Sequence, residues 1–325
     1  MKYLHLVEQP EGEGGERGGG RYVASLRETG TPIPRRDEVL IRVAASGVNR
    51  ADLSQIAGRY PPPSGESEIV GLEVSGTRDD TGEPVCALLA GGGHAEYVAA
   101  PLGQVFPAPR GLDLVTAAGI PEAFLTAFLN LVVDGGLPRE SGVLVHAAAS
   151  GVGLAAIQIA KLSGARVAAT TRSSEKVAGL EAAGADLVVD TSRADVAAEL
   201  EARWGRDTVD VALDPIGPAT LATDLAVLKI GGRIVILSTL SGSRAELDLA
   251  LLMKKRARIV GSTLRSRSRA EKAAIVTRFG AEMLPEFAAG TLKVTVDSVF
   301  PVERAAEAFQ RMRENRNVGK ILIRW

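Results

Sequence analysis

Short apolar stretches separated by turn residues fill the first hundred positions of the chain. Examples are YLHLV (3–7), EVLIRVAASGV (38–48) and PVCALLAGGG (84–93), each broken off by glycine, proline or charged residues. No helical pattern separates these stretches, which predicts an antiparallel, barrel-like β module. The Gly/Glu-rich connector EGEGGERGGG (11–20) is predicted to be a solvated loop between two of the strands.

From about residue 118 the pattern changes to strands that alternate with helices. EAFLTAFLNLVVDGG (122–136) has helical spacing, and apolar strands such as GVLVHAA (142–148) and ARVAATTR (165–172) then alternate with amphipathic segments. Four of these strands are nearly continuous apolar runs, as expected where helices cover both faces of a parallel sheet. The pattern predicts an α/β fold with a doubly wound sheet.

The tail predicts a long helix in 268–290, a strand VDSVFP (296–301), another helix and a last strand GKILIRW (319–325). We expect this tail to rejoin the N-terminal module. The predicted domains are therefore 1–117 together with 265–325, and 118–264.

Composition and charge narrow the class of protein. The chain has 325 residues, a natural length for two domains, with 46% apolar and 24% charged residues and a formal net charge of −1. This charge argues against nucleic acid or an anionic membrane as the main partner. Cys86 is the only cysteine, so no intrachain disulfide is possible. With no cleavage signal and no membrane-spanning stretch, we expect a cytoplasmic protein.

A glycine turn stands between the strand VLVHAA and the helix LAAIQIAKL. Gly151, Gly153 and Ala156 give the spacing G-x-G-x-x-A, which in a strand–turn–helix context indicates a dinucleotide site. Small residues permit close backbone approach, and the free N–H groups of the helix start bind a pyrophosphate. We therefore assign Ser150, Gly151, Val152 and Gly153 to the cofactor. The alternative is a merely tight connection.

The next strand end bears on which dinucleotide binds. NAD sites usually carry an acid there, but this chain reads TTRSSEK (170–176). Arg172, Ser173 and Lys176 are suited to a 2′-phosphate, and one charged hydrogen bond is worth about 1.5–3 kcal/mol. The prediction is NADPH. The alternative is that these are solvated charges at a helix start.

Several motifs resemble one family in the same order from about residue 39 to the C-terminus. ASGVNRADLSQIAGRYPPP, IPEAFLTAF and the glycine turn are similar to the medium-chain dehydrogenase/reductase superfamily. More narrowly they resemble its zinc-independent, zeta-crystallin-like quinone oxidoreductases, in particular the tumour-suppressor-inducible branch. The resemblance implies a GroES-like β-rich catalytic domain plus a doubly wound Rossmann domain, an active-site cleft between them, and a homodimer.

The resemblance also indicates whether the chain could bind a catalytic metal ion. In the superfamily's zinc alcohol dehydrogenases a cysteine stands at the position of Asn49 and a histidine at the position of Leu72. Asparagine does not replace a thiolate, and leucine has no ligand atom. The resemblance therefore implies that this chain uses no metal.

Matched positions supply the remaining candidate residues. Tyr60, Ser150 and Asn49 are implied as catalytic, with Asn49 contacting either the nicotinamide ribose or the substrate. The alternatives are a structural loop tyrosine, a turn serine and, for Thr126, a packed helix residue. The resemblance also implies cofactor contacts outside the glycine turn and outside the residues assigned to the 2′-phosphate. These contacts are Asn49, Thr126, Thr191, Pro215, Leu240, Leu264, Arg265 and Asn317. Lys320 is implied to close over the cofactor from the tail.

The function implied is a metal-free, NADPH-dependent reduction of quinones, small molecules whose developing negative charge is delocalised and needs little Lewis-acid help. Two alternatives stay open. One is an NADPH-dependent reductase of conjugated C=C bonds in enones, enals or enoyl thioesters. The other is a non-catalytic NADPH-binding protein.

Overall fold

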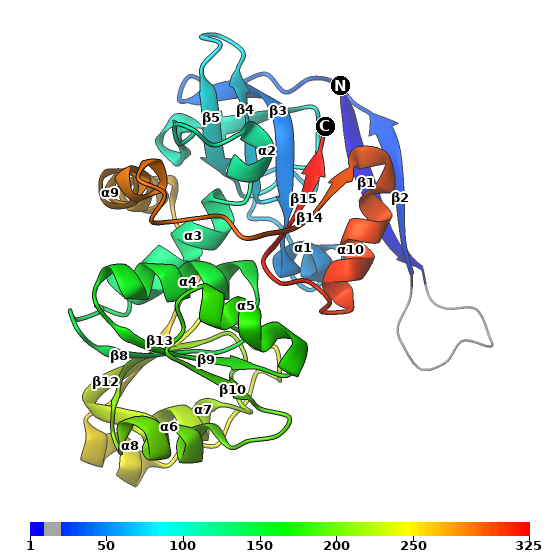
Figure 1. The fold of residues 1–325 in the computed structure, drawn as a ribbon. Helices are drawn as coiled ribbons and strands as arrows, with labels where there is room; N and C mark the ends of the chain where they lie inside the picture. The colour runs from blue at the N-terminus through cyan, green and yellow to red at the C-terminus, as the bar shows by residue number, and fades with distance from the viewer. Residues whose placement is uncertain (10–20) are drawn as a thin grey trace. The chain divides into compact units, whose positions relative to one another are not determined.

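The computed structural model describes residues 1–9 and 21–325, so the connector predicted as a loop at 11–20 lies outside the described residues. The chain forms two compact units. Unit 1 consists of Met1–Leu125 and Arg265–Trp325, and unit 2 of Thr126–Leu264 (Figure 1).

Unit 1 is built on a seven-stranded sheet with the order β14-β15-β3-β4-β5-β7, in which β6 pairs with β3. The strands are β3 (Glu38–Val48), β4 (Glu73–Arg78), β5 (Pro84–Leu88), β6 (Tyr97–Pro101), β7 (Val105–Pro107), β14 (Val296–Pro301) and β15 (Lys320–Arg324). Neighbours are antiparallel, as predicted, except that β14 and β15 run parallel because helix α10 (Ala305–Arg313) crosses between them. A separate hairpin pairs β1 (Lys2–Gln9) with β2 (Arg21–Glu28).

The expectation that no helix separates the early strands is wrong. Helix α1 (Arg50–Ile56) lies between β3 and β4. Its start carries a local signal, since the backbone N–H of Asn49 donates to the Asp52 carboxylate at 2.7 Å, as in a capping box. The helix is only seven residues long, too short for an apolar periodicity to appear.

The chain passes from unit 1 to unit 2 after Leu125, whereas the sequence placed the boundary at 117/118. The intervening residues pack in unit 1. Ala118 belongs to a small core with Ala45, and the Phe124 ring meets Phe287 edge-on at 4.8 Å. Phe124 lies on helix α3 (Pro121–Phe128) and Phe287 on α9 (Arg269–Ala288), so α3 begins in one unit and ends in the other.

Unit 2 is a six-stranded, wholly parallel sheet with the order β10-β9-β8-β11-β12-β13. Helices α4 and α5 cover one face, and α6, α7 and α8 the other (Figure 1), which confirms the doubly wound fold. The strands are β8 (Gly142–Val145), β9 (Arg166–Thr171), β10 (Leu187–Asp190), β11 (Val209–Asp214), β12 (Leu228–Ile236) and β13 (Arg258–Gly261). The helices are α4 (Gly151–Leu162), α5 (Val177–Ala182), α6 (Val196–Trp204), α7 (Leu221–Val227) and α8 (Leu249–Lys255).

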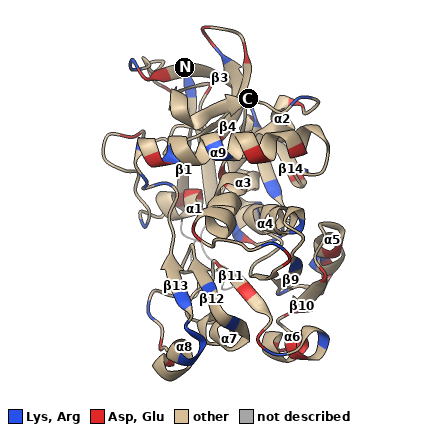
Figure 2. Cartoon of the chain, turned by 90° about the vertical axis from the view of Figure 1, so that its left-hand side faces the viewer, with Lys and Arg blue, Asp and Glu red and all other residues tan. Residues whose placement is uncertain are grey.

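Acidic and basic side chains are interspersed rather than sorted by sign, as along α9 in Figure 2. Within residues 1–9 and 21–325, no helix is both long enough and apolar enough to cross a membrane.

Candidate functional site

The glycine turn forms as the sequence predicts. Helix α4 starts at Gly151, and the Ser150 hydroxyl oxygen caps it by accepting the Gly153 N–H at 3.0 Å. A Cβ added at Gly153 would lie 2.5 Å from the carbonyl oxygen of Ala148, so only glycine fits there. The turn therefore keeps its backbone close to β8 and leaves the N–H groups of Gly151 and Val152 for an anion. These residues fit the pyrophosphate of a dinucleotide.

The end of β9 carries the predicted 2′-phosphate residues. Arg172 directly follows the strand, is exposed, and forms no ion pair within the described residues. Ser173 is anchored by its N–H to the Thr171 hydroxyl at 3.3 Å. Lys176 ends the following 3₁₀ turn (Ser174–Lys176). The loop thus offers a cation and no carboxylate at the position where an acid binds an unphosphorylated ribose.

Other predicted residues of unit 2 follow the carboxyl ends of neighbouring strands. Thr191 follows β10 and its hydroxyl donates to the Thr171 carbonyl at 3.1 Å. Pro215 follows β11 in a loop held by Asp214, whose carboxylate accepts the Ile216 N–H at 2.7 Å. The Leu240 N–H reaches the Pro215 carbonyl at 3.3 Å, which brings the loops after β11 and β12 together. Thr126 and Leu264 are both buried.

Unit 2 also holds a buried ionisable pair that the sequence did not indicate. His146 Nε2 lies 2.7 Å from the Asp224 carboxylate, and His146 Nδ1 lies 3.0 Å from the Thr170 hydroxyl. Both members of the pair are at most 2% exposed. Burial by itself would lower the pKa of His146, but the Asp224 carboxylate outweighs it and the pKa is raised. His146 is thus a packed residue of the unit 2 core.

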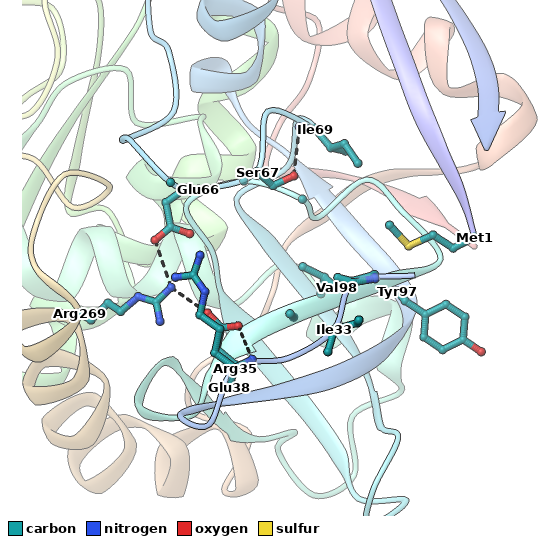
Figure 3. A pocket seen from close by; sticks show the side chains of 15 residues that line it. Met1, Ile33, Arg35, Glu38, Glu66, Ser67, Ile69, Tyr97, Val98 and Arg269 are labelled. Atoms are coloured by element: carbon teal, nitrogen blue, oxygen red, sulfur yellow. Dashed lines mark hydrogen bonds and ion pairs between the residues drawn. The ribbon is translucent and has the colours of Figure 1, made fainter. Parts of the chain in front are cut away.

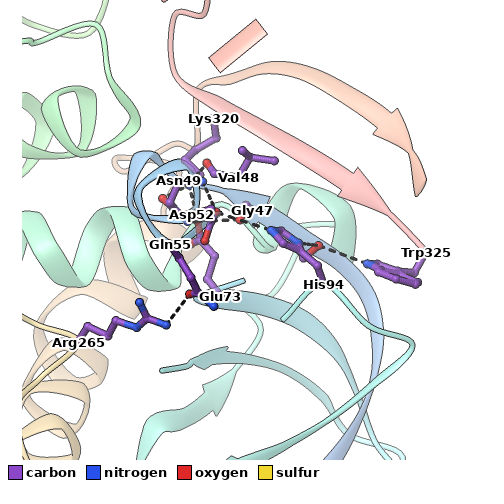
Figure 4. Close-up of polar contacts among 11 residues, drawn as sticks. Gly47, Val48, Asn49, Asp52, Gln55, Glu73, His94, Arg265, Lys320 and Trp325 are labelled. Atoms are coloured by element: carbon purple, nitrogen blue, oxygen red, sulfur yellow. Dashed lines mark hydrogen bonds and ion pairs between the residues drawn. The ribbon is translucent and has the colours of Figure 1, made fainter. Parts of the chain in front are cut away.

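In unit 1 a buried polar network surrounds Asn49 (Figure 4). The Lys320 ammonium donates to Asn49 Oδ1 at 2.8 Å and to the Glu73 carboxylate. Asn49 Nδ2 donates to Glu73 Oε1 at 2.9 Å. The sequence indicated Asn49 but not Glu73. The resemblance implied that Lys320 closes over the cofactor, which stays a prediction; in the structure Lys320 is 4% exposed. A lysine that begins an apolar strand gives no local sign of a buried carboxylate partner.

A catalytic zinc does not fit these residues. At the two positions where zinc relatives have cysteine and histidine, Asn49 is bonded to an ammonium and Leu72 is a buried aliphatic side chain. Neither supplies the thiolate or imidazole that zinc prefers. Across the described ranges, no group of three or more His, Cys, Asp or Glu side chains is arranged to hold a metal ion.

The Tyr60 ring packs against the guanidinium of Arg265. The guanidinium lies 5.0 Å from the centre of the Tyr60 ring and donates to the Tyr60 carbonyl at 3.0 Å, to the Ala90 carbonyl at 2.8 Å and to Gln55 Oε1 at 2.6 Å. Arg265 is 4% exposed, so these contacts fix the loop that carries Tyr60. The contact of Arg265 with the cofactor stays a prediction.

Asn317, the last residue of the predicted set, is buried. Its side-chain amide donates to the Gly319 carbonyl at 2.8 Å and so shapes the turn before β15. Its cofactor contact likewise stays a prediction.

A surface pocket of unit 1 contains none of these residues (Figure 3). Arg269 crosses it, pairing with Glu38 at 2.8 Å and with Glu66 at 3.5 Å. The pocket shares no residue with the predicted site, so it adds nothing to the candidate site.

Glu122, at the start of α3, is predicted to make stability depend on pH. Burial and then the nearby Glu73 carboxylate raise its pKa to about 8. A raised pKa means that the folded protein holds the proton more tightly, so stability is lost as pH rises from about 4.5 through 8. Glu122→Gln should leave urea unfolding nearly unchanged below about pH 4 and stabilise the protein at pH 9 by up to about 5 kcal/mol, at about 1.4 kcal/mol per pKa unit. An identical response in the exposed-site control Glu282→Gln would contradict the prediction.

Comparisons with known proteins cover both units. Residues 35–110 match the family model described as an alcohol dehydrogenase GroES-like domain, and residues 151–280 match the one described as a zinc-binding dehydrogenase. A quinone oxidoreductase from Lama guanicoe is 30% identical over 320 residues, 95% of each chain.

Solved structures agree with the fold. The quinone oxidoreductase from Thermus thermophilus, whose structure was also determined with NADPH, is 30% identical with a TM-score of 0.82 over 100% of both chains. A structure described as an NAD-dependent alcohol dehydrogenase is 29% identical with a TM-score of 0.84, also over 100% of both chains. Together with the GroES-like and Rossmann units, these matches confirm the resemblance. The chain belongs to the medium-chain dehydrogenase/reductase superfamily, and zeta-crystallin-like quinone oxidoreductases are among its relatives.

Proposed function

We propose that this chain is a quinone reductase that uses NADPH and no metal. The observation that carries the choice of coenzyme is Arg172, an exposed cation in place of a carboxylate at the end of β9. The quinone oxidoreductases among the relatives, one of them solved with NADPH, support the choice of acceptor.

When bound, NADPH supplies the hydride. The turn Ser150–Gly153 holds the pyrophosphate through the N–H groups of Gly151 and Val152, and Arg172, Ser173 and Lys176 hold the 2′-phosphate. Tyr60, supported by Arg265, offers a hydroxyl donor to the acceptor oxygen as negative charge develops on it. The other predicted contacts, and the expected homodimer, belong to the same proposal.

Arg172→Ala tests the assignment of the coenzyme. Loss of one charged hydrogen bond should raise KM for NADPH about 10- to 100-fold and leave KM for NADH within about twofold. The matched control is Arg206→Ala, another exposed arginine of unit 2, which should alter neither. Unchanged discrimination between the coenzymes in the Arg172 variant would contradict the assignment.

A panel of acceptors tests the substrate class. Purified protein should oxidise NADPH with benzoquinones and naphthoquinones faster than with enones or enals. Turnover with conjugated C=C bonds alone would assign the reductase of enones instead, and NADPH binding without turnover on either panel would assign a non-catalytic role.

A further inference from the structure

Lys272 lies on the face of helix α9 that packs into the core of unit 1. On this face the Phe279 ring meets Phe106 edge-on at 5.8 Å, and the Phe287 ring meets Phe124 at 4.8 Å. The buried residues of α9 begin with the i, i+3, i+4, i+7 spacing of one helix face. They are Lys272, Ile275, Val276, Phe279, Met283 and Phe287. Lys272 is only 4% exposed, so a lysine occupies a position where the pattern predicts an apolar side chain.

Lys272 differs from the other two buried lysines of the described chain in having no partner. Lys255 and Lys320 are 5% and 4% exposed, and the ammonium of each donates three hydrogen bonds, one of them to a carboxylate. Among the described residues, none accepts a hydrogen bond from Lys272 Nζ or forms an ion pair with it. Unlike the unpartnered Nε2 of His94, Lys272 Nζ is not sealed from solvent. A buried ammonium without an acceptor is unfavourable, so a ligand that supplies an acceptor gains affinity.

The two carboxyl groups that face Lys272 do not neutralise it. Glu66 lies 3.5 Å from Arg269, one helical turn before Lys272, and so belongs to that ion pair. Burial raises the pKa of Glu122 to about 8, so its carboxyl is mostly neutral near pH 7. Burial lowers the pKa of Lys272, and the two carboxyls oppose that effect. The other charged groups that face Lys272, Arg265 and Arg269, are cations, so an anion is the ligand that this surrounding favours.

Lys272 belongs to the same group of side chains as Tyr60, and the whole group lies in unit 1. Arg265 and Glu122 are close enough to both Tyr60 and Lys272 to act on the pKa of each. The nitrogens of Arg265 already donate to two backbone carbonyls and to Gln55 Oε1, so Lys272 is the cation of this group that lacks an acceptor. An aromatic ring and such an ammonium together suit a flat ligand that carries a negative group.

Resting on the proposed function, we propose that Lys272 binds a carboxylate or sulfonate group of the acceptor, so that the preferred substrates are quinones with a negative charge. The ammonium donates to the anionic oxygens, while the ring of the acceptor packs against the Tyr60 ring. One such charged hydrogen bond is worth about ten- to a hundredfold in affinity. Lys272 thus determines which acceptors bind and takes no part in the transfer of the hydride.

Binding is measured by calorimetry with two redox-inactive probes of nearly the same shape, naphthoate and its uncharged amide. At pH 7 the wild type should bind the carboxylate at least about tenfold more tightly than the amide. Lys272→Met should bind the two probes within about twofold of each other, whereas Lys272→Arg should keep a preference for the carboxylate. The matched control is Lys2→Met, which removes an exposed lysine of unit 1 and should keep the full preference.

Urea unfolding separates this role from a structural one. Methionine suits the apolar face of α9, so Lys272→Met should leave the urea midpoint unchanged or raise it. Lys255→Met removes a buried lysine that is paired, leaves its acceptors unsatisfied, and should lower the midpoint. A fall for Lys272→Met as large as that for Lys255→Met would overturn the proposal, because it would show that Lys272 stabilises the fold.

Turnover of naphthoquinone and of its sulfonate applies the same comparison to substrates. The ratio of kcat/KM for the sulfonate to kcat/KM for the parent quinone should fall about tenfold or more in Lys272→Met and stay within about twofold of the wild type in Lys2→Met. An equal loss for both quinones would overturn the proposal by placing Lys272 at the reacting oxygen, and equal binding of the two naphthalene probes to the wild type would also overturn it. A wild type that prefers the carboxylate but reduces no quinone would support the anion site and overturn the proposed function.

Discussion

Gly153→Ala is expected to remove measurable NADPH binding. The added Cβ would lie 2.5 Å from the Ala148 carbonyl oxygen and 2.6 Å from its Cα, so the turn must move away from β8 and carry its N–H groups with it. Several hydrogen bonds to the pyrophosphate depend on these groups, and a loss of about 3 kcal/mol or more corresponds to at least about 100-fold weaker binding. Calorimetric titration with NADPH measures the effect.

Gly280→Ala is the matched control. Gly280 lies in α9, where a flexible Leu284 side-chain atom lies 3.8 Å from the added Cβ, so this change should leave NADPH binding intact. It should also stabilise the helix slightly. If Gly153→Ala binds NADPH within about threefold of the wild type, the turn does not hold the dinucleotide.

Asp224→Ala is expected to lower the free energy of unfolding by about 3–5 kcal/mol, because it leaves His146 buried without its partner. Asp224 raises the pKa of His146, so the pair contributes its full stability below pH 6.5 and loses it as pH rises through the raised pKa. The difference between wild type and variant should therefore be largest near pH 6 and smaller at pH 9. Urea unfolding across this range measures it.

The double variant His146→Leu/Asp224→Leu separates charge from packing. Replacing both polar partners by apolar groups should recover much of the lost stability, and it should remove the pH dependence. A double variant as unstable as Asp224→Ala, with the same dependence on pH, would show that the pair is not the cause.

Sequence patterns predicted the fold class because its signals are local. The apolar strands from 142 onward and the helices between them have the periods of their structures, so the doubly wound sheet could be inferred without any long-range contact. Helix α1 was missed because a seven-residue element shows only its cap. The chain leaves unit 1 only after Leu125 because Ala118 and Phe124 find their apolar partners in distant segments, which no local pattern indicates.

The candidate site likewise has one part that the sequence predicts and another part that only the fold brings together. The turn at Ser150–Gly153 and the cation at Arg172 are contiguous pieces of sequence, whose geometry follows from a strand end and a helix start. The network of Asn49, Glu73 and Lys320 joins residues 247 and 271 positions apart, brought together only when β15 and β4 pair on either side of β3. The sequence by itself determined the family and the dinucleotide turn. Only the tertiary structure decided how the Asn49 amide is oriented, because the donor Lys320 and the acceptor Glu73 that orient it lie on strands far away in the chain.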